Sequence, residues 1–152
     1  MPKFTMGVNQ DQFNAAGSKF VTMTPEEDAK GEAYRLVEFQ MPYWKSPGRT
    51  IGFPVKVTSG DDTGKDQEIF AGVDEKGVWK TKDILRAIRV PITQNKAGFV
   101  EFDDTAVFGK TARGRWIMES GHKGGDPNAE IVRYPKLVDI LPAAATVEDS
   151  LV

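Results

Sequence analysis

The chain has no cysteine and a single histidine, His122, among its 152 residues. Without cysteine there is no disulfide framework, no zinc ribbon or iron–sulfur ligation, and no thiol chemistry. One histidine also argues against the two-histidine zinc motifs. We therefore expect no metal and no cofactor, and a fold that is held together by its hydrophobic core.

Long apolar runs are missing as well. No stretch approaches the roughly 20 residues that span a bilayer. The first thirty residues include Lys3, Asp11 and the acidic run Glu26–Asp28, and they lack the apolar core of a secretory signal. Together with the lack of cysteine, this leads us to expect an intracellular protein with no membrane partner.

An excess of charge of one sign is the third absence. The formal net charge is −2, from 20 basic and 22 acidic residues, and such a balance predicts no class of partner. The charge is unevenly distributed, however. Residues 43–58 carry Lys45, Arg49 and Lys56 with no acid, a sum of +3, and residues 110–123 also reach +3, from four basic residues against one acid.

Alternation of apolar and polar residues predicts a chain rich in β-strands. We expect strands at residues 34–41, 51–58, 67–73, 111–119 and 130–134, with a short strand at 19–23. Pro135 ends the fifth of the long strands, and the pattern leaves open whether it resumes at 137–141. Within these strands, Phe53 and Trp116 alternate with polar residues and are expected in the core.

One helix is predicted, over residues 75–88. Asp74 can cap its start. A stripe of apolar residues would face the core, with Trp79 packed beside it; its members are Val78, Ile84, Leu85 and Ile88. The resulting domain division is an N-terminal arm at 1–31, a folded domain at 32–142 and a flexible tail at 143–152.

Three strands, a helix and two strands follow one another in this order, which is the layout of an OB-fold-like β-barrel. A mainly β fold of this kind is our first expectation, and an α+β sheet with the helix on one face is the alternative. In an OB-fold, ligands bind on the face of the second and third strands and on the loops joining strands one to two and four to five. Both basic segments fall on these elements.

Aromatic residues accompany the basic segments. Tyr43 and Trp44 lie at a strand end, and Phe70 is expected on the outer face of its strand. Cations neutralise phosphates, and aromatic faces stack on bases whatever their sequence. Ordinary solvated basic faces would leave the same pattern, so this reading depends on the fold.

The sequence contains no complete catalytic motif. Residues 59–66 resemble a phosphate-binding loop, but Ser59 and Asp66 stand where the Walker pattern needs glycine and serine or threonine. The pairs Asp61–Asp62 and Asp103–Asp104 are expected to be solvated turn residues rather than magnesium ligands. We expect a protein that is not an enzyme.

A family resemblance centres on the segment FAGVDEKGVWKTKDILRAI at residues 70–88. Downstream of it come VFGK at 107–110, RWIM at 115–118, a glycine-rich turn, and RYPKLVDILP at 133–142. These motifs resemble small phage-encoded replication-associated proteins with an OB-fold, several of which bind single-stranded DNA. The resemblance covers roughly residues 33–142. It implies binding through the barrel groove and a location in the host cytoplasm.

The leading expectation is therefore a single-stranded DNA-binding protein of phage replication or recombination, tolerant of sequence. Its expected nucleic-acid-binding residues are Tyr43, Trp44, Lys45, Arg49, Lys56, Phe70, Arg113, Arg115 and Lys123, all but Tyr43 carried over from the family. The alternatives are a β-rich protein–protein module, such as a virion component or a host-directed inhibitor, and an accessory subunit of a nuclease or polymerase. The acidic, hydrophobic-tipped C-terminus at 147–152 would recruit replication or recombination partners if it resembles the tails of single-strand binders. Homo-oligomerisation stays open.

Overall fold

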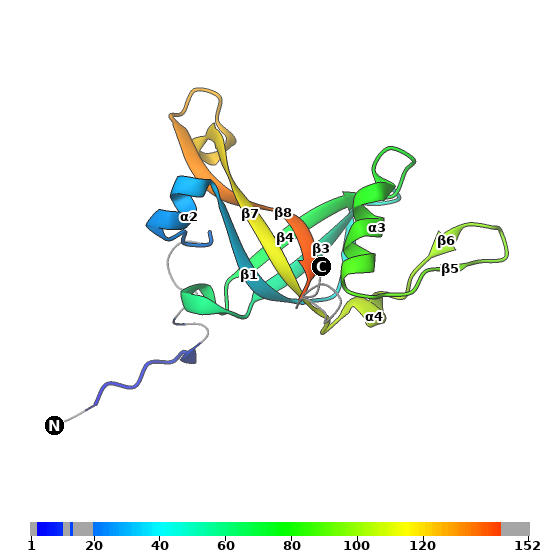
Figure 1. Ribbon diagram of the computed structural model, residues 1–152, viewed down its shortest axis with the longest axis horizontal. Coiled ribbons are helices and arrows are strands. Elements are labelled where there is room, and N and C mark those ends of the chain that lie inside the picture. The colour runs from blue at the N-terminus through cyan, green and yellow to red at the C-terminus, as the bar shows by residue number, and fades with distance from the viewer. Residues whose placement is uncertain (1–2, 11–12, 14–19, 144–152) are drawn as a thin grey trace, which may run out of the picture.

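The protein is described by a computed structural model that covers residues 3–10, 13 and 20–143. Its main feature is one antiparallel sheet in the order β2-β3-β1-β7-β8 (Figure 1). Strand β4 lies outside this order and also pairs with β3. The long strands are β1 (Glu32–Phe39), β3 (Thr50–Val57), β4 (Asp66–Gly72), β7 (Thr111–His122) and β8 (Ile131–Pro142). The short strand β2 (Tyr43–Ser46) completes the sheet, and a small hairpin of β5 (Thr93–Gln94) and β6 (Val100–Glu101) stands apart from it. The prediction of a mainly β fold is confirmed.

The five long strands correspond to the five predicted ones, in the predicted order. The first pairs with the second and the fourth, the second with the third, and the fourth with the fifth. Helix α3 (Val78–Ala87) lies between the third and the fourth, as expected. The sheet is not closed, because β4 and β8 form no ladder, and this agrees with the α+β alternative.

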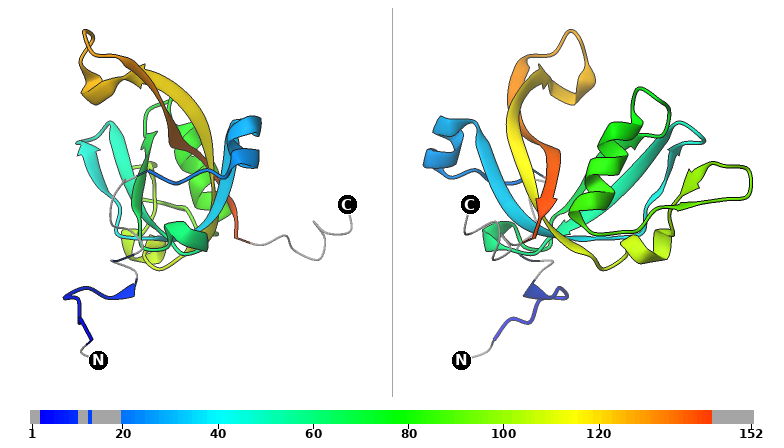
Figure 2. Two further views of the ribbon diagram at one scale, coloured as in Figure 1. Left: turned by 90° about the vertical axis from the view of Figure 1, so that its left-hand side faces the viewer. Right: turned by 45° about the vertical axis from the view of Figure 1, so that its right-hand side comes forward.

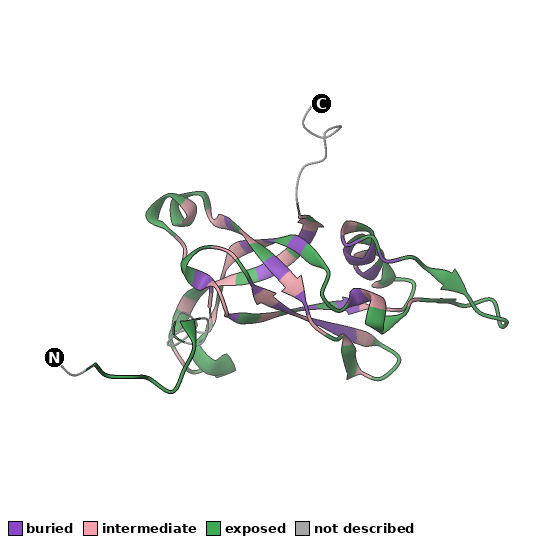
Figure 3. Cartoon of the chain, turned by 90° about the horizontal axis from the view of Figure 1, so that it is seen from below, coloured by how far each residue is buried: buried purple, intermediate pink, exposed green. Residues whose placement is uncertain are grey.

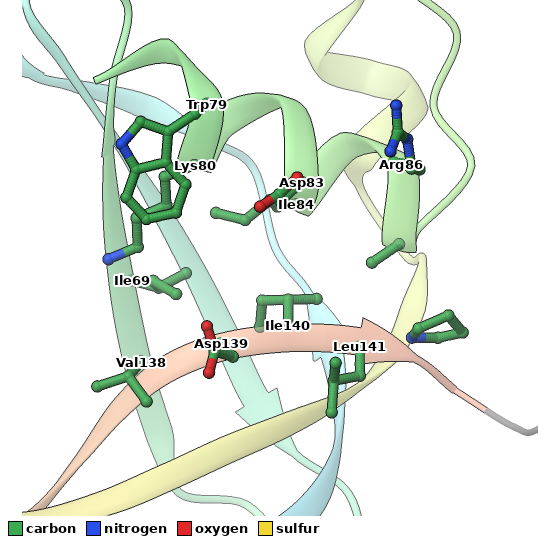
Figure 4. A pocket seen from close by; sticks show the side chains of 12 residues that line it. Ile69, Trp79, Lys80, Asp83, Ile84, Arg86, Val138, Asp139, Ile140 and Leu141 are labelled. Carbon is green, nitrogen blue, oxygen red and sulfur yellow. The ribbon is translucent and has the colours of Figure 1, made fainter. Parts of the chain in front are cut away.

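Helix α3 lies at the gap between β4 and β8. Ile84 of α3 and Ile140 of β8 line a cleft of about 280 Å³ between helix and strand (Figure 4). Both residues are buried, as is Ile69 on β4. Helix α3 therefore connects β4 and β8 through apolar contacts, in the place where a closed barrel has a hydrogen-bonded ladder.

The core lies on the inner face of the curled sheet (Figure 3). On β3, every second residue from Ile51 to Val57 is buried, and Phe53 and Trp116 are fully so, as predicted. The indole nitrogen of Trp116 donates to the Gln67 side chain at 3.3 Å, which satisfies its buried polar group. Strict alternation in the sequence thus located the inner face correctly.

The helix begins three residues later than predicted. Asp74 accepts a hydrogen bond from the Gly77 amide at 2.8 Å, but this bond closes a turn that precedes the helix. Gly72 and Gly77 pack so closely that a Cβ on either would lie 2.9 Å from the other's Cα. This contact brings the helix start down onto β4, and the chain becomes helical only beyond it.

The predicted helix stripe is partly wrong. Thr81 is buried with Ile84 and Leu85, while Val78 is partly exposed. The Trp79 side chain is 60% exposed and does not pack in the core. At 3.6 residues per turn, Trp79 lies about 140° from Ile84 and about 180° from Ile88 around the helix, so it falls opposite the buried stripe. Val78 shares the side of Leu85 but lies on the first turn of α3.

Two stretches of strand were not predicted: β2, and the part of β8 that continues beyond Pro135. Residues 43–46 form β2, which pairs with β3 through a tight turn that the prolines and glycine had marked as a break. Strand β8 is continuous through Pro135, which pairs with Met118. An edge strand tolerates proline, because its missing N–H need not reach a neighbour.

Residues 20–31, which the sequence places in the N-terminal arm, contribute one residue to the core. Val21 is 3% exposed and belongs to the core, although residues 20–23 form no strand. Helix α2 (Pro25–Lys30) begins with a capping box in which Thr24 and Glu27 satisfy each other's backbone amides. Helices α2 and α3 lie on opposite sides of the β7–β8 hairpin (Figure 2). Lys19 and the 147–152 tail lie outside the described residues.

The segment after α3 projects from the body. The β5–β6 hairpin extends away from the sheet, and nearly all of its residues are exposed (Figures 1 and 3). A short helix, α4 (Asp104–Val107), returns the chain to β7 and buries Val107. Among the described residues, no helix is both long and apolar enough to cross a membrane.

Candidate nucleic-acid interface

Strand β2 presents its side chains to two different surfaces. Tyr43 pairs with Gly52 and Trp44 with Ile51 on β3. Since Ile51 belongs to the inner face, Trp44 lies on that side, while Tyr43 and Lys45 lie on the outer one. The two neighbouring aromatics, expected in one groove, therefore point to different faces of β2, although both line one cleft at this edge of the sheet.

Tyr43, Lys45 and Phe70 form what we call the aromatic patch. Gly52 pairs with Tyr43 on one side and with Phe70 on the other, so the two aromatic residues flank a glycine in one row across three strands. The Lys45 ammonium nitrogen lies 5.4 Å from the centroid of the Phe70 ring. Tyr43 is 40% exposed and Phe70 39% exposed, which leaves ring surface free for a ligand.

One carboxylate belongs to the same surface. The Tyr43 hydroxyl donates to Glu68 Oε1 at 2.7 Å. This hydrogen bond, with some burial and the charge of Glu68, raises the pKa of Tyr43 above its ordinary value. It also fixes the direction of the tyrosine ring and occupies one oxygen of the carboxylate.

Three of the predicted cations have no acidic partner in the described part of the chain. Within the described residues, Lys45, Arg49 and Arg113 take part in none of the ion pairs. Arg49 lies in the turn that joins β2 to β3. Arg113 lies on β7, with its guanidinium carbon 5.4 Å from the centroid of the half-exposed Tyr34 ring. These three are the cations best placed to meet phosphates.

The other three predicted cations are already paired. Arg115 donates to Glu32 at 3.0 Å and to Asp139 at 2.8 Å, and these bonds raise its pKa further. Lys56 lies 4.0 Å from Asp66, and Lys123, in the turn between β7 and β8, lies 3.9 Å from Glu130. These acidic partners compete with phosphates for the three cations. Because Trp44 points to the inner face and Lys45 and Phe70 to the outer one, the nine predicted residues do not share one face of the sheet.

A buried charge cluster is the feature that sequence reasoning missed. Asp62 is only 2% exposed and accepts hydrogen bonds from the Thr22 amide, the Lys65 ammonium group and the Arg35 guanidinium group. Lys65 is 6% exposed and also donates to the Phe20 carbonyl at 2.7 Å. Arg35 binds both oxygens of Glu27, at 2.6 and 2.8 Å. The cluster joins the N-terminal segment to β1 and to the turn before β4.

The pKa values of this cluster follow from its contacts. The Arg35 guanidinium lowers the pKa of Glu27 to about 2. Burial alone would raise the pKa of Asp62, but the Thr22 amide and the Lys65 and Arg35 cations outweigh it and hold that pKa below its ordinary value. Two cations and two anions that pair with one another in this way stabilise the fold. The expectation that Asp62 is solvated is wrong.

In the part of the chain that the structure describes, no group of three or more histidine, aspartate or glutamate side chains is arranged to hold a metal ion. The lone histidine, His122, places its Nδ1 2.9 Å from the Ala129 carbonyl oxygen within the β7–β8 turn.

In comparisons with family models, with curated proteins and with solved structures, none matches this chain.

Proposed function

We propose that the protein binds single-stranded DNA with little sequence preference, as part of phage replication or recombination. The observation that carries this proposal is the aromatic patch, where two half-exposed rings flank Gly52 and an unpaired lysine lies over one of them. Stacking on such rings contributes about 1–3 kcal/mol per base without reading its identity. The role in phage biology depends on the family resemblance.

The three cations without an ion pair in the described structure allow the salt dependence of DNA binding to be predicted. Each phosphate neutralised on a single strand contributes about −0.7 to the slope of log affinity against log salt. Contacts from Lys45, Arg49 and Arg113 would therefore give a slope of about −2. A rise from about 50 to about 200 mM salt would then weaken binding by about 16-fold.

The test is a fluorescence anisotropy titration of labelled oligo(dT) at these two salt concentrations. We expect Tyr43→Ala and Phe70→Ala each to weaken binding by about 5-fold or more, because a stacking ring is lost. Lys45→Gln should flatten the salt slope by about 0.7. The absence of any binding below about 10 μM at low salt would disprove the proposal.

Two matched variants serve as controls. Trp44→Ala removes the adjacent ring on the opposite face of β2 and should leave oligo(dT) binding unchanged. Lys96→Gln removes an exposed cation from the turn between β5 and β6 and should leave the salt slope unchanged. Equal effects of Lys45→Gln and Lys96→Gln would mean that the whole-chain charge, and not the aromatic patch, attracts the DNA.

A further inference from the structure

The inner side of β2 forms a second surface with the opposite charge. A cleft of about 510 Å³ lies between β2 and the segment that leads into α4. We call it the Trp44 cleft. Its apolar lining includes Trp44, Ile51, Val73 and Phe102, and its acidic lining consists of Glu101, Asp103 and Asp104.

Among the residues that the structure describes, no basic side chain lines this cleft. Within the described residues, none of its three carboxylates takes part in an ion pair. Asp103 accepts hydrogen bonds from the amide and the hydroxyl of Thr105, which hold its pKa below the ordinary value and keep it charged at neutral pH. The cleft therefore combines negative charge with apolar surface, and it repels phosphates.

Trp44 adds an exposed aromatic ring to the acidic side chains of the cleft. Trp44 is 53% exposed at the wall of the cleft, next to the buried Ile51. An indole face attracts cations and favours arginine, whose planar guanidinium stacks on it while its N–H groups reach carboxylates. A ligand with both a guanidinium and apolar groups would satisfy every part of the lining.

The exposed apolar surface continues beyond the cleft. Val100, which lines it, is 66% exposed, and the adjacent Phe99 is 71% exposed on the projecting hairpin. Adjoining exposed apolar residues of this kind mark surfaces that other proteins cover. A small cation would leave this surface bare, whereas an extended peptide could reach from the cleft onto the hairpin.

We propose that the Trp44 cleft binds a segment of a partner protein in which arginine residues alternate with apolar ones. The arginine would stack on Trp44 and pair with the acidic rim, and the apolar neighbours would contact Phe102, Val100 and Phe99. Tyr43 borders both this site and the aromatic patch, whereas Lys45 and Phe70 do not line the cleft. Peptide binding at this site does not depend on DNA binding, and the two activities can be separated by single substitutions.

The experiment uses a fluorescein-labelled peptide of alternating arginine and leucine, titrated with the full chain and followed by anisotropy. Peptides of alternating glutamate and leucine, and of alternating arginine and glycine, test the need for charge and for apolar groups. We expect saturable binding of the first peptide only. Trp44→Ala should weaken it by about 5-fold or more, since an exposed stacking partner is lost. Phe70→Ala, which removes an exposed ring that does not line the cleft, should leave it unchanged.

The charge requirement needs its own control. The double variant Glu101→Gln with Asp104→Asn should weaken peptide binding by about 10-fold or more. The variant Asp61→Asn with Glu75→Gln removes the same charge from exposed positions elsewhere and should have little effect. Equal loss in both variants would reveal non-specific attraction and overturn the site. So would unchanged binding in Trp44→Ala, or no saturable binding below about 100 μM.

Discussion

The ring of Tyr43 lies so close to Gly52 on the neighbouring strand that a Cβ at position 52 would come within 2.6 Å of it. The glycine therefore leaves the space in which the ring packs against β3. Once there, the ring is held at its far end by the hydrogen bond to Glu68. Gly52 thus sets the position of the aromatic patch, although it has no side chain to contribute.

Gly52→Ala should displace the Tyr43 ring and leave the fold intact. Because the displaced group is an exposed side chain, we expect a loss of unfolding free energy of no more than about 1 kcal/mol. Affinity for oligo(dT) should fall about as much as in Tyr43→Ala. In a Tyr43→Ala background, Gly52→Ala should have no further effect on binding, as a double-mutant cycle would show. An independent loss in that background would contradict the role given to the glycine.

The two arginines of β7 should behave differently. Arg115→Ala leaves Glu32 and Asp139 without their shared cation, so its main effect should be a lower Tm. Arg113 has no acidic partner in the described structure, and Arg113→Ala should instead flatten the salt slope of oligo(dT) binding by about 0.7 while Tm stays nearly unchanged. Thermal unfolding and titrations at two salt concentrations separate these effects. A flatter slope in Arg115→Ala would show that DNA breaks its ion pairs.

Period-two alternation was enough to predict the five long strands and the buried face of β3, because each side chain on a half-buried strand has only two directions to take. The short strand β2 escaped prediction, since its pairing depends on the turn at residues 46–50 rather than on hydrophobicity. The helix start was placed too early because the contact between Gly72 and Gly77 decides where the helix begins. Trp79 was misplaced because the 3.6-residue period puts it opposite the buried stripe, at about 140° from Ile84. Which cations are free could not be predicted at all. Arg113 and Arg115 share a face and a basic segment, and only the register against Glu32 and Asp139 distinguishes them.

Asp62 should be among the polar residues on which stability depends most. Asp62→Asn keeps the shape of the side chain but leaves the buried Lys65 and the largely buried Arg35 without their shared anion. Removing one partner of a buried ion pair costs about 3–5 kcal/mol. Asp61→Asn, which changes the exposed neighbour, should alter the unfolding free energy by less than about 0.5 kcal/mol. Urea titrations of both variants measure the difference, and similar values for the two would contradict the cluster.

The ion pair between Glu27 and Arg35 should make stability depend on pH. The pKa of Glu27 falls from 4.5 to about 2 on folding, so the folded state prefers the ionised carboxylate. The contribution of the pair is therefore fully present above about pH 5 and is lost as the pH falls from about 4.5 towards 2. Because Glu27 is partly exposed and solvent screens it, we expect Glu27→Gln to cost about 1–2 kcal/mol at neutral pH. The free-energy difference from wild type should shrink at about pH 3. Glu26→Gln, on the exposed side of the same helix, should show a small difference that varies little with pH, and a Glu27→Gln difference as large at pH 3 as at pH 7 would refute the assignment.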